Sequence, residues 1–357
     1  MDIHPSHAAL YLTAGFVIVS LVWRKVSLAD PLRRFPGPSL AKRTRLYRVY
    51  YDVVVGGGWL SHLRDLHELY DPSAYADIYS SSAKMLKDPH LYTMFNFGLP
   101  PNVFTETDPK EHTVFKSMLG TFFSRQGILR LENAIQERVD TLVSQLAKNH
   151  KNKPARMNDA FRSTTLDIIT TYTLRSEIDV TSFPFFEHPV ILSLNERLST
   201  IWFFKHFPSF IQLSNILPRW LSAILMPSSV PQLATMKQVS KLVDEALQET
   251  QDKEENETDS NVFYTLIRNA GSKHQHKVTR GYLICEGWNL RIAGSDTVGN
   301  ACTVGTWYLV QEDRVRKKLV SELDEAWPDR DGLMPLERLE KLPYLVSDLL
   351  DSWVSKF

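Results

Sequence analysis

The chain has 357 residues, of which 43% are apolar and 11% aromatic, enough for one large hydrophobic core or two small ones. Its 41 basic and 41 acidic residues give a formal net charge of zero, which argues against binding nucleic acid or another polyelectrolyte over a broad surface. Only two cysteines occur, Cys285 and Cys302, both within one apolar stretch. Their number and spacing exclude a disulfide framework and a cysteine-ligated zinc site, and we assign no metal ligand.

Residues 8–23 carry no charged side chain and are followed at once by the basic pair Arg24-Lys25. An uncharged run with basic residues on its C-terminal side is typical of a membrane anchor that leaves the rest of the chain in the cytosol. As a helix that rises about 1.5 Å per residue, the run is marginally short for the hydrocarbon core of a bilayer. Tyr11 and Trp23 can nevertheless lie at the two membrane interfaces. We therefore predict a single-pass anchor over residues 1–25. A cleaved signal peptide and a buried core helix are the two other interpretations.

The prolines at positions 36 and 38 predict a stiff elbow over residues 26–38, which separates the anchor from one domain over residues 39–357. Helical spacing predominates in that domain, so the predicted fold class is mainly α. Helices are predicted over residues 161–174 and 237–250, and over residues 128–146 with one buried face. The side chains of that face are Ile128, Leu131, Ile135, Val139, Leu142 and Leu146.

An aromatic, proline-broken region covers residues 183–227. Buried aromatic side chains are the ordinary content of a core, so core packing is one interpretation. The other is an apolar substrate entrance or a segment that dips into the bilayer near the anchor.

The stretch with possible chemistry is residues 278–323, in which Thr279 is a plausible helix cap and a long, mostly buried helix follows. Its middle places Gly294, Asp296 and Thr297 within an apolar run. Glycine inside a helix costs about 1 kcal/mol relative to alanine, so Gly294 indicates either close packing or a bend. The acid and the hydroxyl could order a water and pass protons, or they could form a satisfied polar patch at a helix crossing.

Several segments of the chain resemble the cytochrome P-450 family of haem-thiolate monooxygenases. Residues 293–297 resemble its oxygen-activating helix, residues 35–38 its proline-rich elbow, and residues 108–112 with 122–124 the helix that leans on the haem propionates. The sequence of residues 71–79 and 205–208 is most similar to fungal secondary-metabolism members of the trichodiene-oxygenase type. The resemblance covers essentially the whole chain, and it implies a helical P-450-like fold.

The resemblance also implies roles for individual residues and for partners. Thr297 would help to protonate bound oxygen, Asp296 would orient the proton path and Gly294 would open the helix for dioxygen. His112 and Lys116 would contact the haem propionates. The intact relatives bind haem, take electrons from NADPH through a membrane-bound cytochrome P-450 reductase and oxidise an apolar small molecule such as a terpenoid or polyketide. The implied location is the endoplasmic reticulum membrane, with the body in the cytosol.

The sequence also departs from the family pattern, and these departures limit what we expect of it. The haem loop with its axial cysteine does not occur, and Asp351 and Val354 stand where a Glu-x-x-Arg pair is expected. A short strand pair is missing after Tyr70, so the predicted fold is incomplete. Neither cysteine can be carried over as the iron ligand.

We therefore expect a P-450 homologue that is truncated before the haem loop, inactive as written and unable to hold haem stably. One alternative is a fragment or mis-spliced form of an active monooxygenase. The other is a non-catalytic, membrane-bound helical protein.

Overall fold

The structure is a computed structural model that describes residues 37–70, 85–207, 229–249, 261–329 and 332–348, together with residues 209 and 221. The predicted anchor over residues 1–25 lies outside the described residues, as do Asp351, Val354 and most of the aromatic region after residue 207. Of the helices that are described, none combines the length and the apolar character needed to cross a bilayer.

The chain divides into two compact units, of which the first comprises residues 1–85 with 199–207 and the second residues 86–198 with 208–357. Every described element is a helix, which agrees with the predicted mainly α fold class. The first unit contains α2 (Ser39–Arg43), α3 (Leu46–Val49), the π-helix η2 (Tyr50–Val54) and α4 (Trp59–Tyr70). Helix α11 (Pro189–His206) begins in the second unit and ends in the first.

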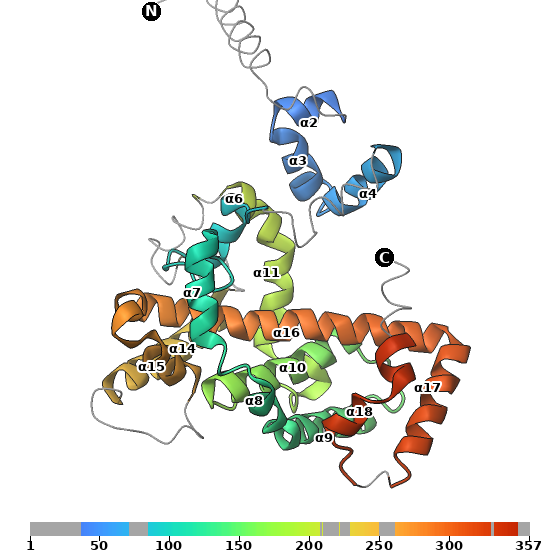
Figure 1. The fold of residues 1–357 in the computed structure, drawn as a ribbon. Coiled ribbons are helices and arrows are strands. Elements are labelled where there is room, and N and C mark those ends of the chain that lie inside the picture. The colour runs from blue at the N-terminus through green and yellow to red at the C-terminus, as the bar shows by residue number, and fades with distance from the viewer. Residues whose placement is uncertain are drawn as a thin grey trace, which may run out of the picture. The chain divides into compact units, whose positions relative to one another are not determined.

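The remaining elements belong to the second unit (Figure 1). They are α6 (Pro89–Tyr92), η3 (Thr93–Asn96), α7 (Pro109–Leu119), α8 (Arg125–Leu129), α9 (Glu132–Asn149), α10 (Met157–Leu174), η4 (Pro184–Phe186), α14 (Ser229–Glu249), α15 (Val262–His274), η5 (Gln275–Lys277), α16 (Arg280–Gln311), α17 (Asp313–Ala326), α18 (Leu336–Leu339) and η6 (Tyr344–Asp348).

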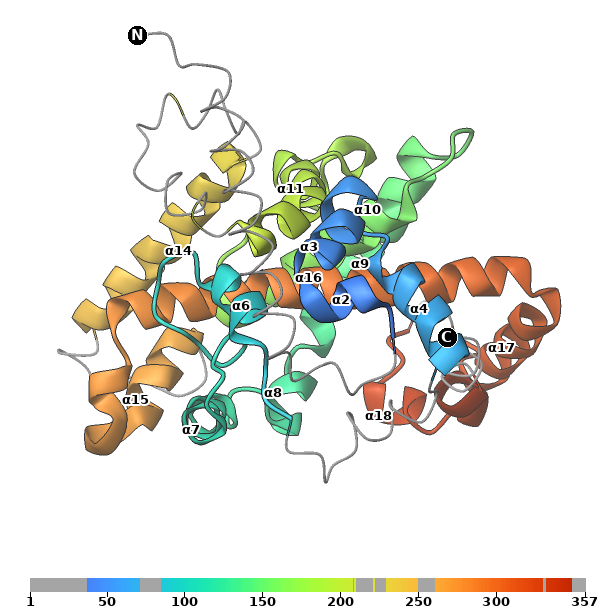
Figure 2. The same cartoon turned by 90° about the horizontal axis from the view of Figure 1, so that it is seen from above.

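The 32-residue helix α16 is the axis of the second unit. It begins where the sequence predicts, because the hydroxyl of Thr279 caps it by accepting a hydrogen bond from the Tyr282 N–H. In both views α14 and α15 lie near its N-terminal end, and α17 follows its C-terminal end (Figure 2). The largest hydrophobic core surrounds the N-terminal part of α16, where Tyr282 and Leu283 pack with Phe115 of α7 and Phe263 of α15.

Helix α10 crosses α16 at very short range, and glycine makes this possible. A Cβ atom at Gly294 would lie 2.5 Å from Cγ1 of Ile169, and one at Gly299 would lie 3.0 Å from the backbone nitrogen of Arg162. Hydrogen bonds join the two helices, because Thr165 donates to the Ser295 carbonyl and Ser295 donates to the Arg162 carbonyl, both at 2.9 Å. Of the two interpretations of Gly294, close packing is therefore the observed one, and α16 runs through it as one helix.

The predicted helix over residues 128–146 differs from the observed structure in two ways. It is divided into α8 and α9, and two side chains of its predicted buried face, Ile128 and Val139, are exposed. Leu142 is buried against Phe161 and Phe186, so only a narrow strip of α9 is covered. The spacing identified the helix correctly but predicted too wide a contact with its neighbours.

Helix α16 is also less buried than predicted. Its N-terminal half lies in the core, but Val298, Trp307 and Val310 in its C-terminal half are exposed. Neighbouring helices pack on α16 mainly along its N-terminal half and the α10 crossing. The apolar sequence of the C-terminal half therefore predicted more burial than the described residues provide.

The α10–α16 crossing can be tested by adding one methyl group. We expect Gly299→Ala to lower the free energy of unfolding by about 2 kcal/mol, because the added Cβ collides with the backbone of Arg162. Gly120→Ala is a matched control, since a Cβ there meets nothing closer than 3.6 Å. Urea denaturation followed by circular dichroism measures both. Equal stability of the two variants would contradict the close crossing.

Candidate functional site

Asp296 forms an ion pair with a buried arginine of the neighbouring helix. Its Oδ1 lies 2.5 Å from Nη2 of Arg162, whose side chain is 3% exposed, while the Asp296 side chain is 34% exposed. The carboxylate thus compensates a cation that has almost no access to water. This pairing holds Asp296 toward α10.

The pair continues into a network of polar side chains on α10 and α11. The Arg162 guanidinium also donates a hydrogen bond to Asn195 of α11. Asn195 in turn donates to Asp159 at 2.9 Å, and the Asp159 carboxylate lies 3.1 Å from Nε of Arg156. The chain of contacts therefore runs from the partly exposed Asp296 through buried groups to Arg156, which is 67% exposed.

Thr297 follows Asp296 in the sequence but lies on a different face of α16. It is exposed, and its hydroxyl donates to the Ala293 carbonyl of the same helix at 2.8 Å. Gly294 faces α10 instead. The three residues that the sequence analysis grouped are thus divided, because Gly294 and Asp296 belong to the helix crossing and Thr297 does not.

His112 and Lys116 are one turn apart on α7, where Lys116 is exposed and His112 is half-buried. Burial lowers the pKa of His112, and the nearby cations of Lys87 and Lys116 lower it further, whereas Glu106 opposes them. Phe115 between them is buried and stacks on Tyr282 of α16 with ring centroids 4.8 Å apart. Among the described residues no hydrogen bond or ion pair joins His112 or Lys116 to Asp296 or Thr297.

Both cysteines lie on α16, and the family that the sequence resembles binds haem through a cysteine thiolate. Cys285 is fully buried, and burial, together with the nearby Glu286 carboxylate, raises the pKa of its thiol to about 12. Cys302 is exposed as a residue, but partial burial of its thiol raises the pKa of that thiol. A thiol with a raised pKa is a poor metal ligand, since the thiolate is the form that binds. Neither of the two cysteines therefore fits the axial ligation of haem.

Glu286 is a buried carboxyl group that sequence reasoning missed. It is 0% exposed, and its Oε2 accepts a hydrogen bond from the Val103 N–H at 3.1 Å. Burial raises its pKa to about 7, although the Val103 N–H and the Tyr282 hydroxyl lower it by hydrogen bonding. Beside it Asn102 donates to the Cys285 carbonyl at 3.1 Å. Glu286 and Asn102 together hold the segment before α7 against α16.

Arg162 and Asn195 were also missed, since each occurs in an otherwise ordinary helix and neither belongs to a recognisable motif. A weak signal for Arg162 exists, because it is a charged residue within the apolar and hydroxyl-rich run of residues 160–170. Only the structure shows that it faces Asp296.

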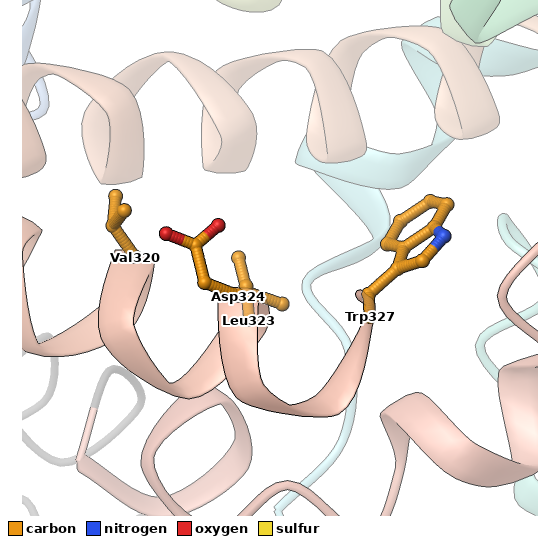
Figure 3. A pocket seen from close by; sticks show the side chains of 4 residues that line it. All are labelled: Val320, Leu323, Asp324 and Trp327. Atoms are coloured by element: carbon orange, nitrogen blue, oxygen red, sulfur yellow. The ribbon is translucent and has the colours of Figure 1, made fainter. Parts of the chain in front are cut away.

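An open groove of about 330 Å³ lies along α17 (Figure 3). Its lining comes from that helix and its C-terminal cap and consists of Val320, Leu323, Asp324 and Trp327. A single carboxylate among apolar side chains is too small a set of groups for catalysis, so this groove adds nothing to the candidate site.

The Asp296–Arg162 pair leads to a first prediction about this site. Asp296→Asn should lower the free energy of unfolding by about 2 kcal/mol, because Arg162 is left buried without its carboxylate and the partial exposure of Asp296 moderates the loss. Thr297→Ala should change it by less than about 0.5 kcal/mol. Chemical denaturation of both variants tests this difference, and an equal loss for the two would show that Asp296 does not hold the crossing.

Glu286 predicts a pH dependence of stability. The native carboxyl group keeps its proton to about pH 7, whereas an unperturbed one loses it near 4.5, so the native state binds more protons in that interval. The free energy of unfolding contributed by this group therefore falls as the pH rises from about 4.5 to 7, by about 3 kcal/mol in total. Glu286→Gln should remove this fall and stabilise the chain above pH 7. Exposed Glu325→Gln should leave the pH profile of the unfolding midpoint unchanged, and identical profiles for both variants would contradict the prediction.

Comparisons with known proteins identify the family. The family model for cytochrome P-450 matches residues 57–347. Cytochrome P-450 monooxygenase MO6277 of Ascocoryne sarcoides is 28% identical over 94% of this chain and 68% of its own. Cytochrome P-450 monooxygenase TRI4 of Trichoderma arundinaceum is 27% identical over 88% of this chain and 63% of its own.

A solved structure shares the fold. The crystal structure of the cytochrome P-450DA haem domain superimposes with a TM-score of 0.56 and 16% identity, over 79% of this chain and 58% of that one. The chain thus spans little more than half of that structure and about two thirds of the curated relatives. Because the family match extends over most of its length, the chain belongs to the cytochrome P-450 family and resembles the fungal secondary-metabolism monooxygenases within it.

Proposed function

We propose that this chain forms the oxygen-side part of a cytochrome P-450 monooxygenase that, when complete, oxidises an apolar secondary metabolite such as a terpenoid or polyketide. The arrangement on α16 is the observation that carries this proposal. Asp296 is fixed in a network of buried polar groups, while Thr297 and Ala293 one turn before it remain on an exposed face. An anchored acid beside an accessible hydroxyl is the pairing that a proton path requires.

Individual roles follow from the same arrangement. Arg162 orients Asp296, because its buried guanidinium holds the carboxylate at short range. Thr297 can exchange its hydrogen bond with the Ala293 carbonyl for one with a reacting group. Gly294 serves the helix crossing, so we assign it a packing role rather than an opening for dioxygen. Lys116 would provide positive charge and His112, whose pKa is lowered, would donate a hydrogen bond to an anionic group, which in the family is a haem propionate.

The chain as given is proposed to be inactive, because neither of its cysteines suits a thiolate ligand. Haem in this family relies on a cysteine thiolate for oxygen chemistry. The buried, protonated thiol of Cys285 and the thiol of Cys302, both on α16, do not supply one. Monooxygenation therefore requires a thiolate from outside the described residues. A transcript that continues in frame past the codon for Phe357 into a cysteine loop would provide it.

The proposed setting is a membrane. Residues 1–25 would anchor the chain in the endoplasmic reticulum with its body in the cytosol, and a membrane-bound NADPH-dependent reductase would supply electrons to the complete enzyme. This proposal is supported by the charge pattern of residues 8–25 and by the family.

Spectroscopy tests the proposed inactivity. We expect the chain, expressed with haem precursor and reductase, to show no thiolate-type absorption band in its reduced carbon monoxide complex and no NADPH-dependent hydroxylation. Cys285→Ser and Cys302→Ser should leave that result unchanged. A full-length family member prepared in the same way is the positive control, and a band that disappears in either serine variant would overturn the proposal.

A further inference from the structure

Arg291 of α16 is a buried cation for which the described residues provide no ion pair. It is 2% exposed, and its Nε and Nη1 atoms are buried and have no hydrogen-bond partner within the described part of the chain. Burial lowers its pKa to about 10 and the Asp167 carboxylate raises it, so the guanidinium keeps its proton at neutral pH. A buried charge with unsatisfied donors costs free energy, and native proteins rarely keep one without a partner.

The other buried arginine at the α10–α16 crossing has the partner that Arg291 lacks. Arg162 is 3% exposed, and it pairs with the Asp296 carboxylate. Arg291 lies one turn before Gly294, where α16 meets Ile169 of α10, so its side chain starts beside the same crossing. One pair of helices thus buries two arginines, and among the described residues only Arg162 has a carboxylate at ion-pair distance.

The carboxylate nearest in charge to Arg291, Asp167 of α10, is already bonded to other groups. Its Oδ1 accepts from the Val180 N–H at 2.9 Å, and its Oδ2 accepts from the Thr181 N–H at 2.8 Å and the Thr181 hydroxyl at 2.6 Å. These bonds hold Asp167 against the turn before η4. Asp167 therefore compensates the charge of Arg291 from a distance but accepts no hydrogen bond from it.

The polar groups near Arg291 add donors rather than acceptors. Burial lowers the pKa of His188, Asp167 raises it and Arg291 lowers it, so this imidazole is neutral at pH 7 and lies near both charges. Its Nδ1 accepts from the Val190 N–H at 3.2 Å, which leaves the ring proton on Nε2. The hydroxyl of Thr170, one turn after Asp167 on α10, is fully buried and has no partner in the described chain. The cluster therefore lacks an acceptor.

We propose that Arg291, with the Nε2–H of His188 and the hydroxyl of Thr170, binds a small inorganic anion of the halide class, which is chloride under ordinary conditions. An anion supplies only acceptor capacity, whereas a water molecule would bring two further donors to groups that already lack acceptors. The burial of Arg291 favours a small monovalent ion over a phosphate or a carboxylate-bearing metabolite. The anion would complete the helix crossing, a structural role separate from the proposed oxygen chemistry.

Urea denaturation of the full chain at constant ionic strength tests this proposal. Sodium chloride would replace sodium gluconate stepwise, with unfolding followed by circular dichroism. We expect the folded-to-unfolded ratio to rise about tenfold and then level off, because a single site saturates. Arg291→Met should abolish the rise and be at least as stable as the natural chain in gluconate, since it removes the uncompensated cation. Arg314→Met, at an exposed arginine of α17, is the matched control and should keep the rise.

Each other outcome counts against the site. An equal rise in Arg291→Met and the natural chain would show a general salt effect, and no rise in the natural chain would favour ordered water instead. A larger rise with sodium phosphate or acetate would overturn the halide assignment.

A second measurement decides the matter if Arg291→Met does not fold. Crystals of the natural chain grown with sodium bromide should show anomalous density beside the Arg291 guanidinium, and its absence would overturn the proposal. Bromide density without a chloride-dependent rise in solution would indicate an adventitious ion only, which also overturns it. Because none of these readouts depends on haem or on activity, failure of the anion site would leave the proposed function standing.

Discussion

The close crossing of α10 and α16 is the constraint on which the second unit depends. At Gly294 and Gly299 the two helices are near enough that a methyl group cannot fit between them. This distance lets hydroxyl groups of Thr165 and Ser295 bond to carbonyls of the opposite helix, contacts that longer separations exclude. Small and hydroxyl-bearing residues thus replace the aliphatic interdigitation of an ordinary crossing, and they fix the rotation of α16 about its axis.

That rotation decides the chemistry of the site. With Ser295 turned into the crossing, Asp296 meets Arg162 and Thr297 faces away from α10. Adjacent residues in a helix differ by about 100° around the axis, so here the acid lies at the crossing while the hydroxyl next to it lies on the exposed face. The helix crossing positions the Asp296 carboxylate, and the Thr297 residue stays exposed to solvent.

The sequence allowed the helical fold class, the start of α16 and the position of the polar motif to be predicted, because caps and apolar spacing are local signals. The extent of burial could not be predicted in this way. Ile128, Val139 and Trp307 have the apolar character of core residues, yet their exposure depends on which neighbours reach them. Arg162 and Asn195 were missed for the same reason, since their importance comes from residues more than 30 positions away that only the folded chain brings close.

The contact between Arg162 and Asn195 gives the network a thermodynamic consequence. Asn195 belongs to α11, so the arginine that balances Asp296 is held by a helix that does not carry the acid. Linkage between two sites is reciprocal, so a shift of α11 that moves Asn195 alters how firmly Arg162 holds Asp296, and loss of the Asp296 contact alters how firmly Arg162 holds Asn195. The position of Asp296 on α16 and the position of α11 are therefore coupled through the guanidinium group of Arg162.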